Sequence, residues 1–217
     1  MDSYGFTPAR RAVSRGNAPC VGALIEAGFD INTKRGLDGL TVLYQAIMSG
    51  VAMMRYLLSQ QGAEMIINAP DSYGVTPVHA AVIGEEFGLE RVGLRLQRGA
   101  EMGVNDSHED TPVQRAVRWG TVGCMRAFLD AGFDISTRGH RGRTILYNAA
   151  TRNSTAVAKD LRRQGGGVIT INAQDDQGSM ALHLAAKSYC CGKIVRLLKL
   201  HGADPWIKDF EGNTPAM

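Results

Sequence analysis

Thr76-Pro77-Val78-His79-Ala80-Ala81-Val82, which follows the polar turn Asp71-Ser72-Tyr73-Gly74, decides the fold of this 217-residue chain. Six near-copies of the stretch, spaced 33 to 36 residues apart, begin at Thr7, Thr41, Thr76, Thr111, Thr144 and Met180. A seventh opens at Thr214-Pro215 and is cut off by the end of the chain. A fixed period of this length is typical of a solenoid, in which each unit is too small to bury its own core and packs on its neighbours.

Each unit contains the pattern of two short helices. Thr76 can cap a helix, and Pro77 suits the first helical position, where a missing N–H does no harm. Apolar residues then recur at helical spacing over residues 78–82, and a second apolar pattern over residues 20–25 predicts the second helix of the first unit. The second helix of every unit is expected to end at a glycine, namely Gly28, Gly62, Gly99, Gly132, Gly165 and Gly202.

The motif and its period resemble the ankyrin repeat over essentially the whole chain. The resemblance implies an all-α fold, an ankyrin-repeat solenoid in which helix-turn-helix repeats are linked by β-hairpin loops. We expect a single ankyrin-repeat domain over residues 1–217. Its repeats are placed at approximately 2–35, 36–70, 71–105, 106–138, 139–174 and 175–208, with a partial repeat at 209–217.

Four residue types occur at the position of the motif histidine. In chain order the six residues are Arg10, Tyr44, His79, Gln114, Tyr147 and His183. In the family this histidine typically bonds backbone between repeats, which gives His79 and His183 a structural role. Tyr44 and Tyr147 can keep such a bond through their hydroxyl groups. For Arg10 and Gln114 the connecting bond is an open question. Glu109 stands where a turn glycine is expected, so a distorted hairpin is predicted there.

A longer period is also present. The segment Ala27-Gly28-Phe29-Asp30-Ile31 recurs at residues 131–135, and Ile67-Asn68-Ala69 recurs at residues 171–173. Repeats 4 to 6 therefore look like a duplicate of repeats 1 to 3.

Composition limits the location and the chemistry. The chain has no apolar run of about 18 residues and no signal-peptide pattern at its start, so we expect an intracellular protein, cytoplasmic or nuclear. Its four cysteines lack the spacing of a zinc site. No metal and no cofactor are expected.

The resemblance also implies that hairpin tips and first helices line a concave groove. Arginines and a tryptophan concentrate at such positions in repeats 4 and 5, which favours an acidic partner because both residue types often dominate binding energy. The alternative is a solvated surface with Trp119 packed among arginine stems. The predicted partner-binding residues are Arg115, Arg118, Trp119, His140, Arg141, Arg143, Tyr147, Arg152, Lys187 and Tyr189.

Three functions are compatible with this fold. A non-enzymatic protein–protein interaction scaffold or adaptor that binds an acidic segment is the first, since no nucleophile elbow, phosphate loop or metal triad is present. Self-association through uncapped terminal repeats would be compatible with it. The second is small-molecule binding or catalysis in the groove, for which His108, Asp110, Arg115, His140 and Tyr147 would have to converge. Nucleic-acid binding ranks last because the net charge is only +3.

Overall fold

The computed structural model describes residues 7–34, 37–83, 88–119, 121–152, 154–163, 170–187 and 192–215, with the side chains of 161–163 also outside the description. Over these residues the chain is helical and contains no β-strand. None of the helices found there is long and apolar enough to cross a membrane. The chain divides into two compact units, Met1–Ser107 and His108–Met217. This boundary coincides with the duplication seen in the sequence.

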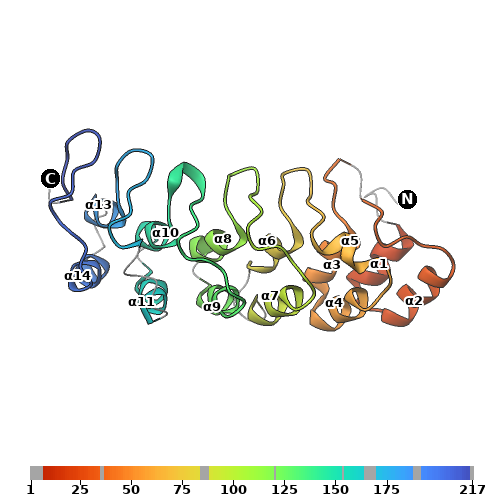
Figure 1. Ribbon diagram of the computed structural model, residues 1–217. Helices are drawn as coiled ribbons and strands as arrows, with labels where there is room; N and C mark the ends of the chain where they lie inside the picture. Colours follow the sequence, from red (N-terminus) through yellow and green to blue (C-terminus); the bar gives the residue numbers. More distant parts are fainter. Residues whose placement is uncertain are drawn as a thin grey trace. The chain divides into compact units, whose positions relative to one another are not determined.

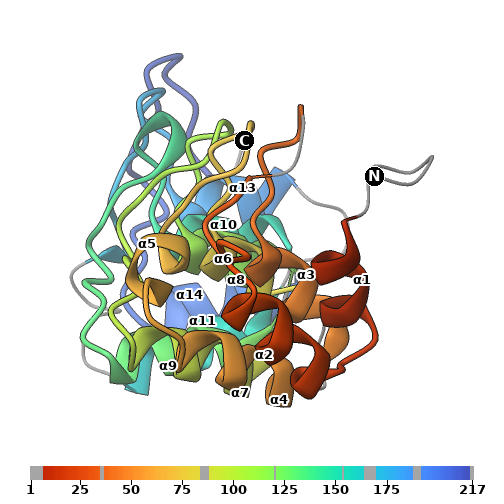
Figure 2. The same cartoon turned by 90° about the vertical axis from the view of Figure 1, so that its right-hand side faces the viewer.

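The first unit consists of three helix pairs and one additional short helix. The pairs are α1 (Pro8–Ser14) with α2 (Ala18–Glu26), α3 (Val42–Ser49) with α4 (Val51–Leu58), and α6 (Pro77–Ala81) with α7 (Gly88–Leu96). Helices α1, α3 and α6 form one layer, and α2, α4 and α7 form a second (Figure 1). The hairpin loops rise from the first layer, on the side away from the second (Figures 1 and 2).

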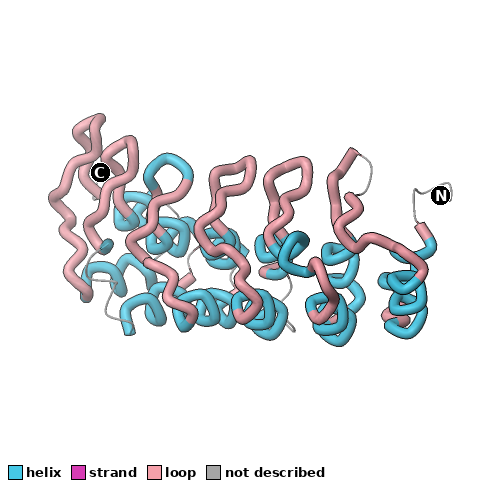
Figure 3. Tube along the Cα trace, turned by 45° about the vertical axis from the view of Figure 1, so that its right-hand side comes forward, coloured by secondary structure: helices cyan, strands magenta, loops and turns pink. Residues whose placement is uncertain are grey.

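The second unit repeats this arrangement. Its pairs are α8 (Pro112–Trp119) with α9 (Val122–Asp130), α10 (Ile145–Thr151) with α11 (Thr155–Arg163), and α13 (Ala181–Lys187) with α14 (Gly192–Leu200). A 3-10 turn, η1 (His140–Gly142), lies in the hairpin before α10 and is the helical segment at a loop tip in Figure 3. Helix α10 packs against both α8 and α13, so the first helices of this unit lie side by side.

Small residues allow these first helices to pack closely. Ala46, Ala81, Ala116, Ala149 and Ala185 are all buried at matching motif positions. Larger residues fill the space between the two layers, and the fully buried ones include Leu43, Met54, Leu57, Met125, Phe128 and Ile194. Full burial of each such side chain contributes about 1.5–3 kcal/mol of transfer free energy.

In four repeats the residue at the motif's histidine position bonds the hairpin of the next repeat. Arg10 Nη2 donates to the carbonyl of Leu40 at 2.5 Å, and the Tyr44 hydroxyl donates to the carbonyl of Val75. The acceptor is in each case the residue just before the next motif threonine. In the second unit, Gln114 Nε2 donates to Arg143 O at 3.2 Å, and His183 Nε2 lies 3.1 Å from Asn213 O. The bond predicted for Tyr44 is confirmed, and Arg10 and Gln114 make equivalent bonds.

The motif threonines cap the first helices as predicted in several repeats. The hydroxyls of Thr7, Thr111 and Thr144 accept from the backbone N–H three residues later, at 3.2 to 3.4 Å. At Thr76 the backbone N–H donates to His79 Nδ1 at 3.1 Å. Met180 has no hydroxyl, and its N–H donates to His183 Nδ1 at 3.3 Å.

Glu109 keeps the left-handed backbone of the turn glycine that it replaces, so the distortion expected there is confined to the bond that the hairpin makes with the next one. Glu109 has φ of 57°, the same left-handed region that Gly74 (70°) and Gly178 (75°) occupy. Its carbonyl accepts from His140 N at 3.0 Å, whereas in the first unit Ser107 N donates at 2.9 Å to Tyr73 O, which is one residue before the turn glycine. The contact with the following hairpin is therefore kept, but its acceptor is shifted by one residue at Glu109.

Helix α5 (Ala63–Ile67) has no counterpart in the sequence prediction, which gave only the end of the second helix at Gly62. The stretch between Gly62 and Gly74 is longer than the corresponding stretch between Gly202 and Gly212. The additional residues coil into one helical turn because this buries the side chains of Ile66 and Ile67.

Candidate recognition face

The predicted partner-binding residues lie on the first helices and hairpins of the second unit. Arg115, Arg118 and Trp119 belong to α8, Arg152 follows α10, and Lys187 ends α13. Since these first helices pack side by side, their carboxyl ends form one edge. We call Arg115, Arg118, Trp119, Arg152 and Lys187 the basic ridge. A cation in the last turn of a helix is also stabilised by the helix dipole.

The exposed part of the basic ridge consists of Trp119, Arg152 and Lys187. Trp119 is 55% exposed, although tryptophan is usually well buried. Arg152 and Lys187 are exposed and, over the described part of the chain, form no ion pair. Arg115 is half-buried. The last predicted residue, Tyr189, lies outside the described residues.

Arg118 is held by a carboxylate of its own unit. Its Nη2 lies 2.7 Å from Asp110 Oδ2, and the Asp110 side chain is almost completely buried. Asp110 directly precedes the motif threonine, so this ion pair fastens α8 to the loop before it. The charge of Arg118 is therefore partly compensated before any partner arrives.

Arg143 and Tyr147 form an internal cluster. The guanidinium of Arg143 lies 4.9 Å from the centre of the Tyr147 ring, a cation–π distance. Its Nε lies 3.9 Å from Asp175 Oδ2. Tyr147 is only 3% exposed, and this burial raises the pKa of its hydroxyl to about 12. Tyr147 thus lies inside the unit under Arg143 and presents almost no surface.

His140 and Arg141 occupy a hairpin tip. His140 Nδ1 lies 3.0 Å from Glu109 Oε2, which joins two consecutive hairpins through exposed side chains. Arg141 is exposed and has a positive φ of 56°. The two residues sit in the loop before α10, whereas the basic ridge lies at the carboxyl ends of the helices.

The groups considered for catalysis do not share one surface. Asp110 is buried and pairs with Arg118, Tyr147 is buried under Arg143, and His140 pairs with Glu109. His108 is exposed in its hairpin. Among the residues that the structure describes, no group of three His, Cys, Asp or Glu side chains could hold a metal ion.

The first unit contains a cavity of about 510 Å³ that the site prediction missed. It is lined by residues of α1, α3, α6 and α7 and of the loops beside them. Met48 and Ile83, which line it, follow the Ala-Ala region of their repeats, where groove residues are expected. Their position in the repeat could therefore have indicated this cavity from the sequence. The site prediction missed it because it followed the arginines of repeats 4 and 5, and neither Met48 nor Ile83 is charged.

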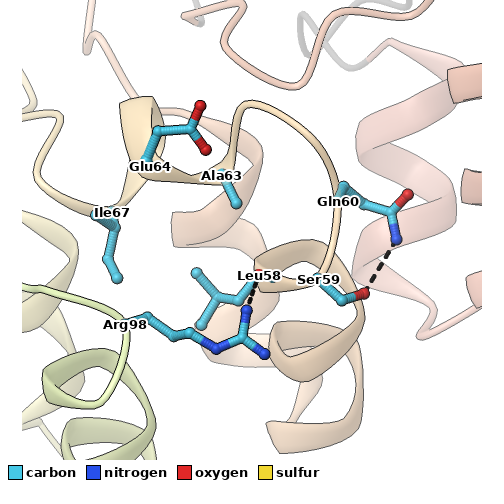
Figure 4. A pocket seen from close by; sticks show the side chains of 7 residues that line it. All are labelled: Leu58, Ser59, Gln60, Ala63, Glu64, Ile67 and Arg98. Carbon is cyan, nitrogen blue, oxygen red and sulfur yellow. Dashed lines mark hydrogen bonds between the residues drawn. The ribbon is translucent and has the colours of Figure 1, made fainter.

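A smaller cavity of about 300 Å³ lies between α4, α5 and the end of the third repeat. Figure 4 shows the guanidinium of Arg98 reaching the end of α4, where it donates to the carbonyl oxygen of Leu58. Such a bond satisfies one of the carbonyls that a helix leaves free at its C-terminus. This cavity therefore surrounds the side chain that caps the C-terminus of α4.

These features define a class of protein, in which stacked helix pairs present side chains from several repeats on an open surface. A family model for ankyrin repeats, in three copies, matches residues 9–89 and 139–209. The chain belongs to the ankyrin repeat family. Ankyrin repeats are in general protein–protein interaction modules.

Comparison with individual proteins agrees with the family. The chain is 29% identical to the E3 ubiquitin-protein ligase KEG of Arabidopsis thaliana over 90% of its length, which is 12% of that protein. It is 27% identical to mouse ankyrin repeat and SOCS box protein 16, over 96% of the chain and 46% of that protein. The chain thus spans less than half the length of these relatives.

Two solved structures resemble the fold. The ankyrin repeat domain of Bcl-3, described as a member of the IkappaB protein family, matches with a TM-score of 0.84 and 27% identity. The match covers 97% of this chain and 92% of the Bcl-3 chain. The ankyrin repeat domain of human ASB11 matches with a TM-score of 0.80 at 24% identity, over 97% and 90% of the two chains.

Proposed function

We propose that this chain is a non-enzymatic interaction module, a scaffold or adaptor, whose basic ridge binds an acidic segment of a partner protein. The observation that carries the proposal is the exposure of Trp119 at the end of α8, on the same edge as the cationic ends of α10 and α13. A large aromatic side chain in water is costly, and it becomes favourable when a partner covers it.

The charge of the ridge suggests the chemistry of the partner. Arg152 and Lys187 can attract carboxylates, which raises the rate of association and selects against basic segments. Arg118 contributes less to this attraction than its sequence position suggests, because it already forms an ion pair with Asp110 at 2.7 Å. We therefore assign the selectivity for an acidic segment chiefly to Arg152 and Lys187.

The relatives support an adaptor role by analogy. One is a ubiquitin-protein ligase and another is named for its SOCS box, and in both the matching region is only part of the protein. In such proteins the repeats share a chain with another activity. A module that selects a partner for that activity is the simplest role for this chain as well.

The proposal is tested by reversing two charges. The full chain is titrated with a fluorescein-labelled peptide of glutamate, glycine and leucine, and anisotropy gives the dissociation constant. R152E combined with K187E should weaken binding at least about tenfold, because two attractive contacts become repulsive. Circular dichroism should show unchanged melting.

A matched control separates a local site from net charge. Lys193 and Lys199 are exposed on α14, in the second layer of the same unit. K193E combined with K199E makes the same change in net charge and should leave the dissociation constant within about twofold. If both double variants weaken binding equally, the peptide responds only to overall charge and the ridge is not its site.

A further inference from the structure

The cavity of about 510 Å³ in the first unit has the size of a binding pocket, since ligand pockets typically enclose about 300–1,000 Å³. All of its lining residues belong to this unit: Arg10, Leu40, Tyr44, Gln45, Ile47, Met48, Ala80, Ile83 and Arg91. Three successive repeats contribute to it, so the pocket depends on the stacking of the repeats rather than on any one of them.

The pocket wall is mostly apolar and opens to the surface. Met48 is 80% exposed and Ile83 is 46% exposed, while Ile47 and Ala80 continue the apolar wall. Methionine is unbranched and polarisable, so it adapts to the shape of an incoming apolar group. A surface of this kind gains free energy when an apolar side chain displaces its water.

Among the described lining residues the charged groups are Arg10 and Arg91, both cations, and none is an aspartate or glutamate. Arg10 also holds the carbonyls of Leu40 and Thr33, at 2.5 and 3.2 Å, so its guanidinium is fixed in place. A fixed guanidinium loses little freedom when it meets a carboxylate.

A third cation lies behind the wall. Arg95 is fully buried, and its Nε and Nη2 have no hydrogen-bond partner, while its Nη1 donates to Arg91 O at 3.0 Å. Burial, together with repulsion from the charge of Arg91, lowers the pKa of Arg95 to about 9, while Tyr44 has the opposite effect on this pKa. Both Arg91 and Tyr44 line the pocket. A buried cation of this kind is costly and gains from a nearby anion.

We propose that this pocket binds an apolar side chain of a partner peptide that carries a carboxylate beside it. Met48 and Ile83 would receive the apolar group, and Arg10 and Arg91 would face the carboxylate. The site lies in the first unit and uses none of the residues of the basic ridge. It therefore stands independently of the proposed function of the second unit.

The test follows methyl signals in the full chain. Protein labelled with ¹³C at methionine and isoleucine methyls is titrated with a peptide in which leucines four residues apart flank glutamates. Met48 and Ile83 signals, assigned with M48L and I83V, should shift together, while Met65, exposed on α5, should not. A leucine-to-serine peptide should bind about tenfold more weakly, because it lacks the apolar anchor. A glutamate-to-lysine peptide should not compete.

Variants connect the shifts to the pocket. M48E should abolish the Ile83 shift, and M65E, the same change on another exposed methionine, should leave it intact. The shift should also persist in the R152E and K187E double variant, which separates this site from the basic ridge. The proposal is overturned if neither methyl moves at millimolar peptide, or if the serine peptide is equally effective. A response to dodecanoate alone would likewise overturn it, since the occupant would then be a lipid carboxylate.

Discussion

Arg10, Tyr44, Gln114 and His183 meet the same structural requirement with different side chains. Each supplies an N–H or O–H group to the carbonyl that precedes the next motif residue, at the position where the family has a histidine. A buried carbonyl without such a donor would cost about 1–3 kcal/mol. The requirement thus lies in the acceptor, and any donor of suitable length can satisfy it.

Glu109 offers a test of backbone strain at one residue. Its φ of 57° disfavours any β-branched side chain, whereas asparagine tolerates the left-handed region. E109V should therefore lower the free energy of unfolding by about 1–2 kcal/mol relative to E109N. Urea denaturation of the two variants measures the difference.

The pair of variants contains its own control. Both substitutions remove the carboxylate that lies 3.0 Å from His140, so the loss of that ion pair cancels in the comparison. Equal stability of E109V and E109N would mean that the hairpin can adopt another turn at no cost. The φ of 57° would then not be required by the contact with His140 N.

At the scale of elements, the sequence predicts what depends on local chemistry. Helix starts follow from the motif threonines and prolines, and the closing glycines Gly28, Gly62, Gly99, Gly132 and Gly202 all have positive φ, while Gly165 lies outside the described residues. Helix α5 was missed because its formation depends on where Ile66 and Ile67 find a core. The pocket of the first unit was missed for the same reason, since its wall comes from four helices far apart in the sequence.

The exposure of the predicted binding residues follows from the sequence only in part, for an equally physical reason. The positions of Trp119 and Arg152 on a shared edge follow from the repeat alone, and both are exposed. The pairing of Arg118 with Asp110 and the burial of Tyr147 under Arg143 depend on side-chain directions within the fold. A count of arginines along the sequence therefore overestimates the charge that is available to a partner.

Helix α5 can be tested as an element. Ile66 is 1% exposed and Met65 lies beside it, largely in solvent. I66A should lower the free energy of unfolding by about 2–4 kcal/mol, because it leaves a cavity under the helix. M65A should change it by less than about 0.5 kcal/mol, as is usual for surface sites. If thermal and urea unfolding show a similar small loss for both, α5 does not contribute to the core.

At the scale of the whole molecule, the two units differ in the chemistry that they offer. The first presents an apolar pocket with arginines around it, and the second presents an exposed tryptophan with cations beside it. The two units share their packing positions, such as the buried alanines of the first helices. The exposed positions differ between the units, which is why we propose a separate recognition surface for each.

Trp119 is the residue on which the interaction of the whole chain should depend most. Because it is 55% exposed, W119A should lower the melting temperature by no more than about 2 °C, while it weakens binding of the acidic peptide by about 2 kcal/mol or more. Anisotropy and calorimetry on the same preparations measure both effects. The Met48 methyl response should stay as in the unchanged chain, since that pocket lies in the other unit. A large loss of stability with unchanged affinity would instead make Trp119 a packing residue, and the acidic segment would have to bind elsewhere.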